Sequence, residues 1–156
     1  VFFNSAGIGA APVICYESIY GEFVSDYVKN GATFIAIITN DAWWGNTPGH
    51  RQHLQYASLR AIETRKSVAR SANTGISGFI NQRGDILAAS EYWVQDAMKG
   101  TIMSNDILTF YTKHGDFLAK GSPYLAILLI GYTVVLVFIR RKTKSSGKVK
   151  ETNLQN

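Results

Sequence analysis

The sequence has few of the residues that cross-link or interrupt a chain. It holds one cysteine, Cys15, and three prolines among 156 residues. A single cysteine cannot form a disulfide within the chain, which excludes a disulfide-stabilised scaffold. Charged residues are also sparse, at 17%, whereas hydrophobic residues make up 46%. This balance argues against a disordered chain and is typical of a globular domain with a membrane segment.

Two further absences limit the chemistry. His50 and His53 have the i, i+3 spacing that can chelate a metal, but no third ligand lies near them in the sequence. We therefore predict no metal site and no cofactor. Residues 75–79 read GISGF and lack the second glycine of a G-x-S-x-G turn, which excludes a serine hydrolase.

The net charge of +5 belongs to one end of the chain. Residues 140–156 hold six of the sixteen basic residues and one of the eleven acidic ones, so residues 1–139 hold ten of each. A nucleic-acid-binding protein usually carries its positive charge on the folded part. We therefore predict no nucleic-acid partner. The excess follows an apolar run, which favours a membrane.

This apolar run, residues 123–139, reads PYLAILLIGYTVVLVFI and contains no charge. As a helix it spans roughly 25 Å, and counting from Leu118 makes it long enough for the ~30 Å hydrocarbon core. We predict a transmembrane helix over residues 121–139. The basic residues that follow predict a cytoplasmic tail, residues 140–156, with residues 1–120 on the other side. The polar tail is expected to be disordered. The alternative is a buried core helix or a central strand.

The region before this run predicts an α/β fold. Ala11–Tyr16 and Thr33–Thr39 are short apolar runs typical of buried strands, and a helix from about Ile19 to Lys29 separates them. This order predicts a parallel pair with a right-handed crossover. The remaining predictions are a helix over 49–66 and short strands over 67–72, 76–81, 86–90 and 100–104, with 91–99 and 105–122 irregular.

Cys15 stands at the end of the first predicted strand, just before a helix. Backbone N–H groups and the helix dipole there stabilise a negatively charged sulfur. The N–H of Tyr16 could also point at an oxyanion on a substrate bonded to Cys15. The alternative is that Cys15 is simply a small buried hydrophobe.

Glu17 follows two residues after Cys15. Its carboxylate could act on protons or orient an amine, or it could be a buried structural acid paired with an arginine such as Arg70.

A second polar cluster follows the second predicted strand, so it should lie at the same edge of the sheet. It consists of Asn40, Asp41, Trp43 and Trp44, which we predict to bind substrate. Two tryptophans on a loop can wall a pocket for acyl chains or insert at a membrane surface. The alternative is that one of them fills the core.

Three segments resemble the bacterial apolipoprotein N-acyltransferases of the nitrilase, or carbon-nitrogen hydrolase, superfamily. They are PVICYES (12–18), the stretch from TNDAWWG to SGFI (39–80), and QRGDI (82–86). The resemblance runs from about residue 11 to residue 90, and the apolar run with its basic tail agrees with it.

The resemblance implies that residues 1–120 are the C-terminal part of a nitrilase-like α/β/β/α sandwich. It implies transfer of an acyl chain from a phospholipid to the N-terminal amine of a diacylglyceryl-cysteine apolipoprotein, on the outer side of the bacterial inner membrane. Cys15 would carry the acyl group as a thioester. The backbone of Tyr16 would help hold the oxyanion, Glu17 would support activity, and Trp43 would line the lipid-facing side.

The sequence also departs from this family. Its members activate the cysteine with an upstream glutamate and lysine, whereas residues 1–14 contain neither. We expect a fragment that lacks half of the sandwich and is inactive alone; acyl transfer by this chain, lost on Cys15→Ala, would overturn that. Two other interpretations stay open, namely a membrane-tethered amidase or nitrilase that uses Cys15 and Glu17, and a non-catalytic membrane-anchored module.

Overall fold

The computed structural model describes the backbone of residues 1–152 and the side chains of residues 1–139. The chain divides into two compact units, Val1–Gly115 and Asp116–Asn156. The first unit holds all the strands of the described chain, and the second consists of one long helix.

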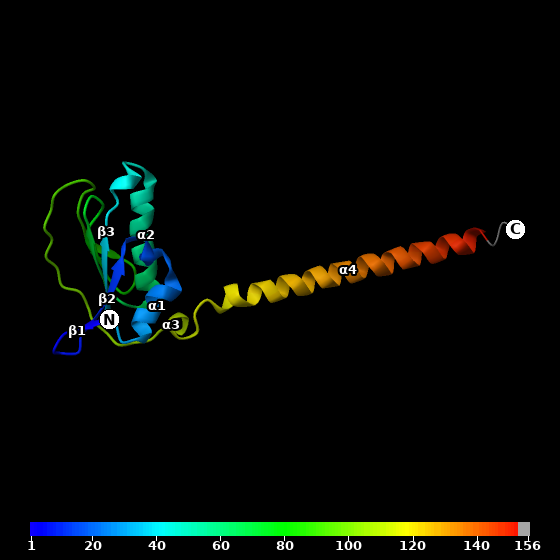
Figure 1. Cartoon of the computed structure of the whole chain (residues 1–156), viewed down its shortest axis with the longest axis horizontal. Coiled ribbons are helices and arrows are strands. Elements are labelled where there is room, and N and C mark those ends of the chain that lie inside the picture. The colour runs from blue at the N-terminus through cyan, green and yellow to red at the C-terminus, as the bar shows by residue number, and fades with distance from the viewer. Residues whose placement is uncertain (153–156) are drawn as a thin grey trace. The chain divides into compact units, whose positions relative to one another are not determined.

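The first unit is built on a six-stranded sheet with the strand order β1-β2-β3-β4-β5-β6 (Figure 1). Its strands are β1 (Phe2–Phe3), β2 (Gly9–Ile14), β3 (Phe34–Thr39), β4 (Val68–Ala72), β5 (Gly78–Ile80) and β6 (Ile86–Ala89). The central strands β2, β3 and β4 are parallel, and the other neighbours pair antiparallel. The predicted α/β class and the predicted parallel pair are therefore confirmed.

Two helices connect the parallel strands and cover one face of the sheet. Helix α1 (Gly21–Lys29) joins β2 to β3, and α2 (Pro48–Thr64) joins β3 to β4. Figure 1 shows both on the same side of the sheet, as right-handed crossovers require. A short helix, α3 (Phe110–His114), packs against them. The core between helices and sheet consists mainly of Ala11, Val13, Val24, Ile35, Ile37, Leu54, Ala57, Ala61, Val68 and Ile80.

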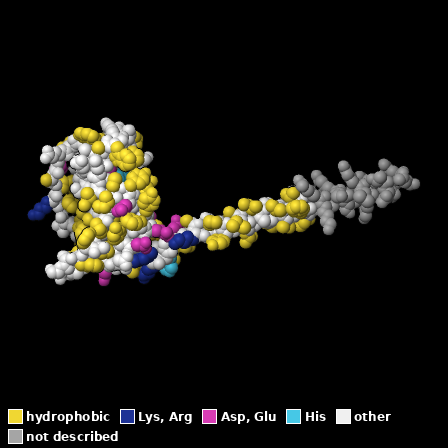
Figure 2. All heavy atoms as spheres, in the orientation of Figure 1, with side chains coloured by type: hydrophobic (Ala, Val, Ile, Leu, Met, Phe, Trp, Pro, Cys, Tyr) yellow, Lys and Arg dark blue, Asp and Glu magenta, His cyan; other side chains and the backbone are white. Residues whose placement is uncertain are grey.

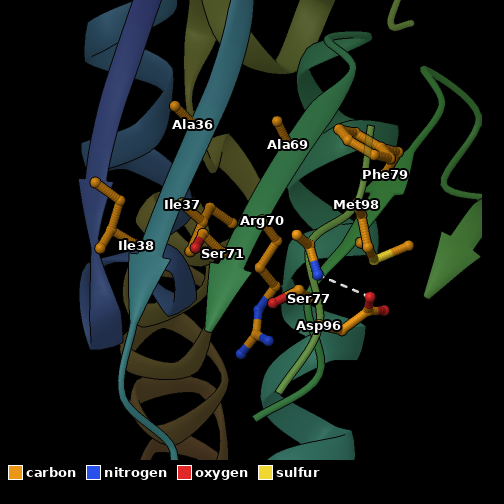
Figure 3. A pocket seen from close by; sticks show the side chains of 12 residues that line it. Ala36, Ile37, Ile38, Ala69, Arg70, Ser71, Ser77, Phe79, Asp96 and Met98 are labelled. Carbon is orange, nitrogen blue, oxygen red and sulfur yellow. Dashed lines mark hydrogen bonds between the residues drawn. The ribbon is translucent and has the colours of Figure 1, made fainter. Parts of the chain in front are cut away.

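The opposite face of the sheet is partly open. Along β3 the side chains alternate, so Ile35 and Ile37 are buried against the helices while Ile38 is 58% exposed on the other side. An open pocket of about 370 Å³ lies on this face (Figure 3). It is lined by Ala36, Ile37, Ile38, Ala69, Arg70, Ser71, Ser77, Gly78, Phe79, Asp96, Ala97 and Met98. A single irregular segment, residues 91–108, therefore covers only part of this face.

This irregular segment is tied down near its end by a buried lysine. Lys66 is fully buried, and its Nζ donates to the carbonyl oxygens of Asn105 (2.7 Å) and Ile107 (2.9 Å) and to Asn105 Oδ1 (2.9 Å). Burial lowers the pKa of Lys66, and the nearby charge of Asp106 partly opposes that shift. Lys66 thus anchors residues 105–107 to the turn between α2 and β4.

Some predicted elements differ from the structure. The strand expected over residues 100–104 is wrong, because that stretch pairs with no strand of the described chain. The first predicted strand ends at Ile14, since Cys15–Ile19 form a short 3-10 helix, η1. Within the stretch expected to be irregular, residues 110–114 form α3 and a further helix begins at Phe117.

The second unit is helix α4 (Phe117–Thr152). Its segment Phe117–Ile139, 23 residues, is long and apolar enough to cross a membrane, and none of it is buried. Hydrophobic side chains line this segment in Figure 2. The helical backbone continues to Thr152, over a stretch where a disordered tail was expected. The side chains after Ile139 and residues 153–156 lie outside the described residues, as does the rest of that prediction.

Candidate active site

Cys15 begins the turn that leaves the carboxyl end of β2. It is half-buried, and its φ of 50° lies in the left-handed region. That conformation costs a residue with a Cβ about 1–2 kcal/mol. Surrounding contacts must therefore hold it, and strained backbone of this kind is typical of functional positions.

The carboxylate of Glu17 provides one of these contacts. Glu17 Oε2 accepts a hydrogen bond from the backbone N–H of Ile14 at 2.7 Å. This bond spans Cys15 and ties η1 back to the end of β2. The alternative in which Glu17 pairs with Arg70 is wrong, because Arg70 binds a different carboxylate.

Two side chains hold the carbonyl oxygen of Cys15. The hydroxyl of Ser18 donates to it at 2.9 Å, and Nε2 of His53 lies 3.2 Å from it. His53 Nε2 is also 3.0 Å from Ser18 Oγ. Ser18 and His53 are buried, so the carbonyl of Cys15 is fixed from the protein interior.

His53, on α2, is held in turn by Asp41. Asp41 Oδ1 lies 2.9 Å from His53 Nδ1, and its Oδ2 accepts from Arg70, on β4, at 2.7 Å. Asp41 also accepts from the hydroxyl of Thr39 at 3.1 Å. Burial alone would raise the pKa of Asp41, but the hydrogen bonds and charges of His53 and Arg70 lower it to about 2. Asp41 is therefore a fully buried carboxylate at neutral pH.

Aromatic side chains lie beside this network. Tyr16 stacks on Trp44 with ring centroids 6.3 Å apart, and it lies 5.9 Å from the ring of His53. Trp44 in turn lies against Gly49, where an added Cβ would overlap the indole ring. Trp43 is 75% exposed, so it does not fill the core. Trp44 is thus packed against its neighbours, whereas Trp43 is open to solvent.

The loop after β3 is also fastened from the other side. Asn40 is exposed, and its Oδ1 accepts from the N–H of Ala42 and from the hydroxyl of Thr74, both at 3.1 Å. The ring of Tyr92 stacks on His50 with centroids 3.9 Å apart, and its hydroxyl donates to the carbonyl of Gly45 at 2.7 Å.

The two histidines of α2 therefore have separate partners. Within the described residues, no group of three His, Cys, Asp or Glu side chains is placed to hold a metal ion.

The model of the carbon-nitrogen hydrolase family matches residues 2–111. The chain belongs to the carbon-nitrogen hydrolase family. Among curated proteins it is similar to the apolipoprotein N-acyltransferase of Chlorobaculum tepidum, with 35% identity over 132 residues, 85% of this chain and 24% of the relative. The enzyme of that name from Haemophilus influenzae is 36% identical over 132 residues, 85% of this chain and 25% of the relative. The chain thus spans about a quarter of the length of these relatives.

Among solved structures, the chain matches part of Saccharomyces cerevisiae Nit3, described as a member of branch 10 of the nitrilase superfamily. Its TM-score is 0.43 at 20% identity, covering 55% of this chain and 34% of that one.

Within this carbon-nitrogen hydrolase chain, the residues predicted from the sequence gather at one edge of the sheet. Cys15, Tyr16 and Glu17 leave β2, and the loop from Asn40 to Trp44 leaves the adjacent strand β3. Asp41 is fully buried, so in this structure it holds His53 and Arg70 and does not face solvent. Cys15, Tyr16, Asn40 and both tryptophans keep some exposure.

Sequence reasoning missed Ser18, His53 and Arg70 as parts of this site. His53 was considered only as a metal ligand. The available signal was an aspartate just after a strand, followed by a histidine about a turn into the next helix. That order places both side chains at the carboxyl edge of the sheet.

Proposed function

We propose that this chain carries the nucleophile of an apolipoprotein N-acyltransferase. The observation that carries the proposal is Cys15, held in a left-handed turn at the carboxyl end of β2. It stands in a chain at least 35% identical to curated enzymes of that name in two bacteria. The proposed donor is a phospholipid, and the proposed acceptor is the N-terminal amine of a diacylglyceryl-cysteine apolipoprotein.

The reaction would proceed in two steps through Cys15. In the first step the sulfur attacks the ester carbonyl carbon of the phospholipid. The C–O bond breaks, the lysophospholipid leaves as an alcohol with one proton, and a thioester remains. In the second step the neutral amine attacks the thioester carbon. An amide bond forms, the amine loses one proton, and the thiolate of Cys15 is released.

Neighbouring groups have definite tasks in this proposal. The backbone N–H of Tyr16 donates to the oxyanion that forms in each step. Glu17 keeps the turn in place through its bond to Ile14 and supports activity in that way. Trp43 and Trp44, with Asn40 and Asp41 holding their loop, line the path of the acyl chain.

The proposed reaction also needs a base that takes the proton of the Cys15 thiol. Over the residues whose side chains are described, the sulfur of Cys15 takes part in no hydrogen bond. The ring nitrogens of His53 are engaged with Asp41, Ser18 and the Cys15 carbonyl. We therefore expect this chain alone to transfer no acyl group.

Formation of a thioester on Cys15 tests the proposal. We would replace the matching segment of the Chlorobaculum tepidum relative with this chain and supply a phospholipid with radiolabelled acyl chains. Label released by neutral hydroxylamine is expected on the chimera. It should be absent from Cys15→Ala and unchanged in Lys29→Ala, an exposed control. A chimera that matures apolipoprotein equally well with Cys15→Ala would refute the proposal.

The family match also favours a second candidate, hydrolysis of a carbon-nitrogen bond by Cys15. Both candidates share the covalent intermediate and differ in what resolves it. Water would release a free acid from an amide substrate, whereas an amine acceptor would carry the acyl group away as an amide. Release of free acid from a small amide, with no amide formed on an added lipopeptide, would select the hydrolase.

We also propose that α4 spans the bacterial inner membrane, with residues 1–115 on the outer side. The length and composition of Phe117–Ile139 and the basic residues that follow support this. Because Cys15 is the single cysteine, it reports its own side. A membrane-impermeant maleimide should label it in intact spheroplasts; labelling only after lysis would place residues 1–115 in the cytoplasm.

A further inference from the structure

In the proposed chemistry Asp41 only holds its loop, yet Asp41 also belongs to a buried network of hydrogen bonds. It runs from Arg70 through Asp41 to His53 and ends on the carbonyl oxygen of Cys15. Its members come from β4, the loop after β3 and α2, which are three elements outside the turn that carries the nucleophile. Asp41, His53 and Arg70 are each at least 95% buried. A buried polar network that ends on one peptide group can fix the orientation of that group.

The contacts of His53 place its ring between Asp41 and Cys15. Asp41 Oδ1, an acceptor, lies 2.9 Å from Nδ1, so Nδ1 donates to it. On the other side of the ring, Nε2 lies 3.2 Å from the carbonyl oxygen of Cys15 and 3.0 Å from Ser18 Oγ. Ser18 Oγ in turn lies 2.9 Å from the same carbonyl oxygen. His53 and Ser18 thus enclose the carbonyl of Cys15 together, while Asp41 fixes the imidazole from behind.

Peptide geometry carries this contact to the reactive side of the turn. The carbonyl of Cys15 and the N–H of Tyr16 belong to one planar trans peptide, in which they point in opposite directions. Because His53 and Ser18 hold the carbonyl toward the interior, the N–H of Tyr16 points away from it. The same peptide plane follows the left-handed φ of Cys15. A group that holds the carbonyl therefore also aims the donor proposed for the oxyanion.

We propose that His53 is a positioning residue that orients the Cys15–Tyr16 peptide through the Cys15 carbonyl. In this role Asp41 and Arg70 fix the imidazole, and the imidazole fixes the peptide. The orientation of the peptide follows from the contacts alone, whereas its value for acyl transfer rests on the proposed function. Both are therefore measured separately.

The first measurement uses the full chain in detergent micelles. Cysteine labelled with ¹³C at every carbon and ¹⁵N-tyrosine give one signal in an HNCO spectrum, because Cys15 is the single cysteine and Tyr16 follows it. His53→Gln keeps an N–H where Nε2 lies, whereas His53→Asn reaches only Asp41. We expect the signal and the Cys15 ¹³Cα and ¹³Cβ shifts to stay near wild type in His53→Gln and to move in His53→Asn and His53→Ala.

His50→Gln is the matched control, because His50 is a buried histidine on the same helix that stacks on Tyr92. It should leave the Cys15–Tyr16 signal in place even where it lowers stability. An unchanged signal in folded His53→Asn and His53→Ala overturns the proposal. If His53→Ala does not fold, Ser18→Ala and His53→Asn decide in the same way, since both remove a contact to the Cys15 carbonyl.

The second measurement is thioester formation in the chimera. A misplaced oxyanion donor should slow acylation of Cys15 by about 10- to 100-fold in His53→Asn, with KM for the phospholipid unchanged, and His53→Gln should restore most of the rate. Loss of rate in proportion to loss of stability, with no rescue by glutamine, indicates a merely structural histidine and overturns the positioning role. A chimera inactive in every form, with the spectral changes as expected, refutes only the proposed function.

Discussion

Asp41 and Lys66 are two fully buried charged residues at opposite ends of the same pair of strands. Asp41 follows β3 at the carboxyl edge of the sheet, and Lys66 precedes β4 at the amino edge. Asp41 has a charged partner, Arg70, and a second donor in His53. Among the described residues, Lys66 donates to neutral oxygens, those of Asn105 and Ile107, and the charge of Asp106 acts on it without a hydrogen bond.

Both pKa values are lowered, but the lower pKa favours the charged form of Asp41 and disfavours the charged form of Lys66, and the different partners explain this. Burial disfavours both charges, but only at Asp41 do opposite charges and donated hydrogen bonds outweigh it, so its pKa is lowered to about 2 and the charge is kept. At Lys66 burial prevails, and a lowered pKa means that the charged form is held less well. At the carboxyl edge of the sheet, Asp41 thus stays charged and holds His53 and Arg70. At the amino edge, Lys66 holds residues 105–107 through hydrogen bonds to neutral oxygens.

The largest loss of folding stability is expected when the buried pair of Asp41 and Arg70 is broken. Asp41→Asn leaves the guanidinium of Arg70 buried without an anion, which typically costs about 3–5 kcal/mol. Urea unfolding in a nonionic detergent, followed by tryptophan fluorescence, measures the loss. The control is Asp26→Asn, which removes an exposed pair with Lys29 and should cost less than about 1 kcal/mol. Equal losses in the two variants would contradict the role given to Asp41.

The carboxylate of Asp41 should also make the stability of the fold depend on pH in the acid range. The pKa of Asp41 falls from 3.8 to about 2 on folding. The carboxylate therefore contributes fully to the free energy of unfolding above pH 4, and this contribution is lost as the pH falls through about 2. A shift of this size corresponds to about 2 kcal/mol. The gap in stability between wild type and Asp41→Asn should therefore narrow below pH 4; a constant gap down to pH 2 would argue against the ionised carboxylate.

A smaller loss of folding stability is expected when Lys66 is replaced. Lys66→Met removes the donor to the carbonyl oxygens of Asn105 and Ile107, while Asn105 Oδ1 still accepts from the N–H of Ile107. This loss costs about 1–3 kcal/mol, but the change also removes the cost of burying an ammonium group. We expect a net loss of about 1 kcal/mol, with earlier proteolytic cleavage in residues 91–108. Lys29→Met, at an exposed lysine, should change neither.

The pH dependence at Lys66 should run the other way. Its folded pKa lies below the unfolded value of 10.5, so between these two values the unfolded chain binds the extra proton. Wild type should therefore gain stability relative to Lys66→Met as the pH rises toward 10.5. A relative loss over that range would show that the ammonium is well accommodated after all.

Much of the fold was predictable because its signals are local. The apolar runs of β2 and β3, separated by a helix of the right length, predict a parallel pair, and they also place Cys15 and Asp41 at one edge. The strand expected over residues 100–104 was wrong because a β-branched stretch needs a neighbour to pair with. Its segment runs instead beside the open face, anchored by Lys66.

The supporting network could not be predicted in the same way. His53 contacts the Cys15 carbonyl across 38 positions in sequence, and Arg70 reaches Asp41 across 29. Such contacts depend on how α2 packs against η1, which no local pattern reports. The sequence reasoning expected Glu17 and Arg70 to pair as one alternative, although each binds elsewhere once the helices are in place.

The close contact between Trp44 and Gly49 links two positions in evolution. The indole of Trp44 occupies the space that any side chain at position 49 would need. A larger residue at 49 is therefore compatible with a smaller one at 44, whereas a side chain added at 49 alone would overlap the indole of Trp44. Among relatives of this chain, these two positions are expected to vary together. Evolution would then change the shape of the loop surface near Cys15 through both positions at once.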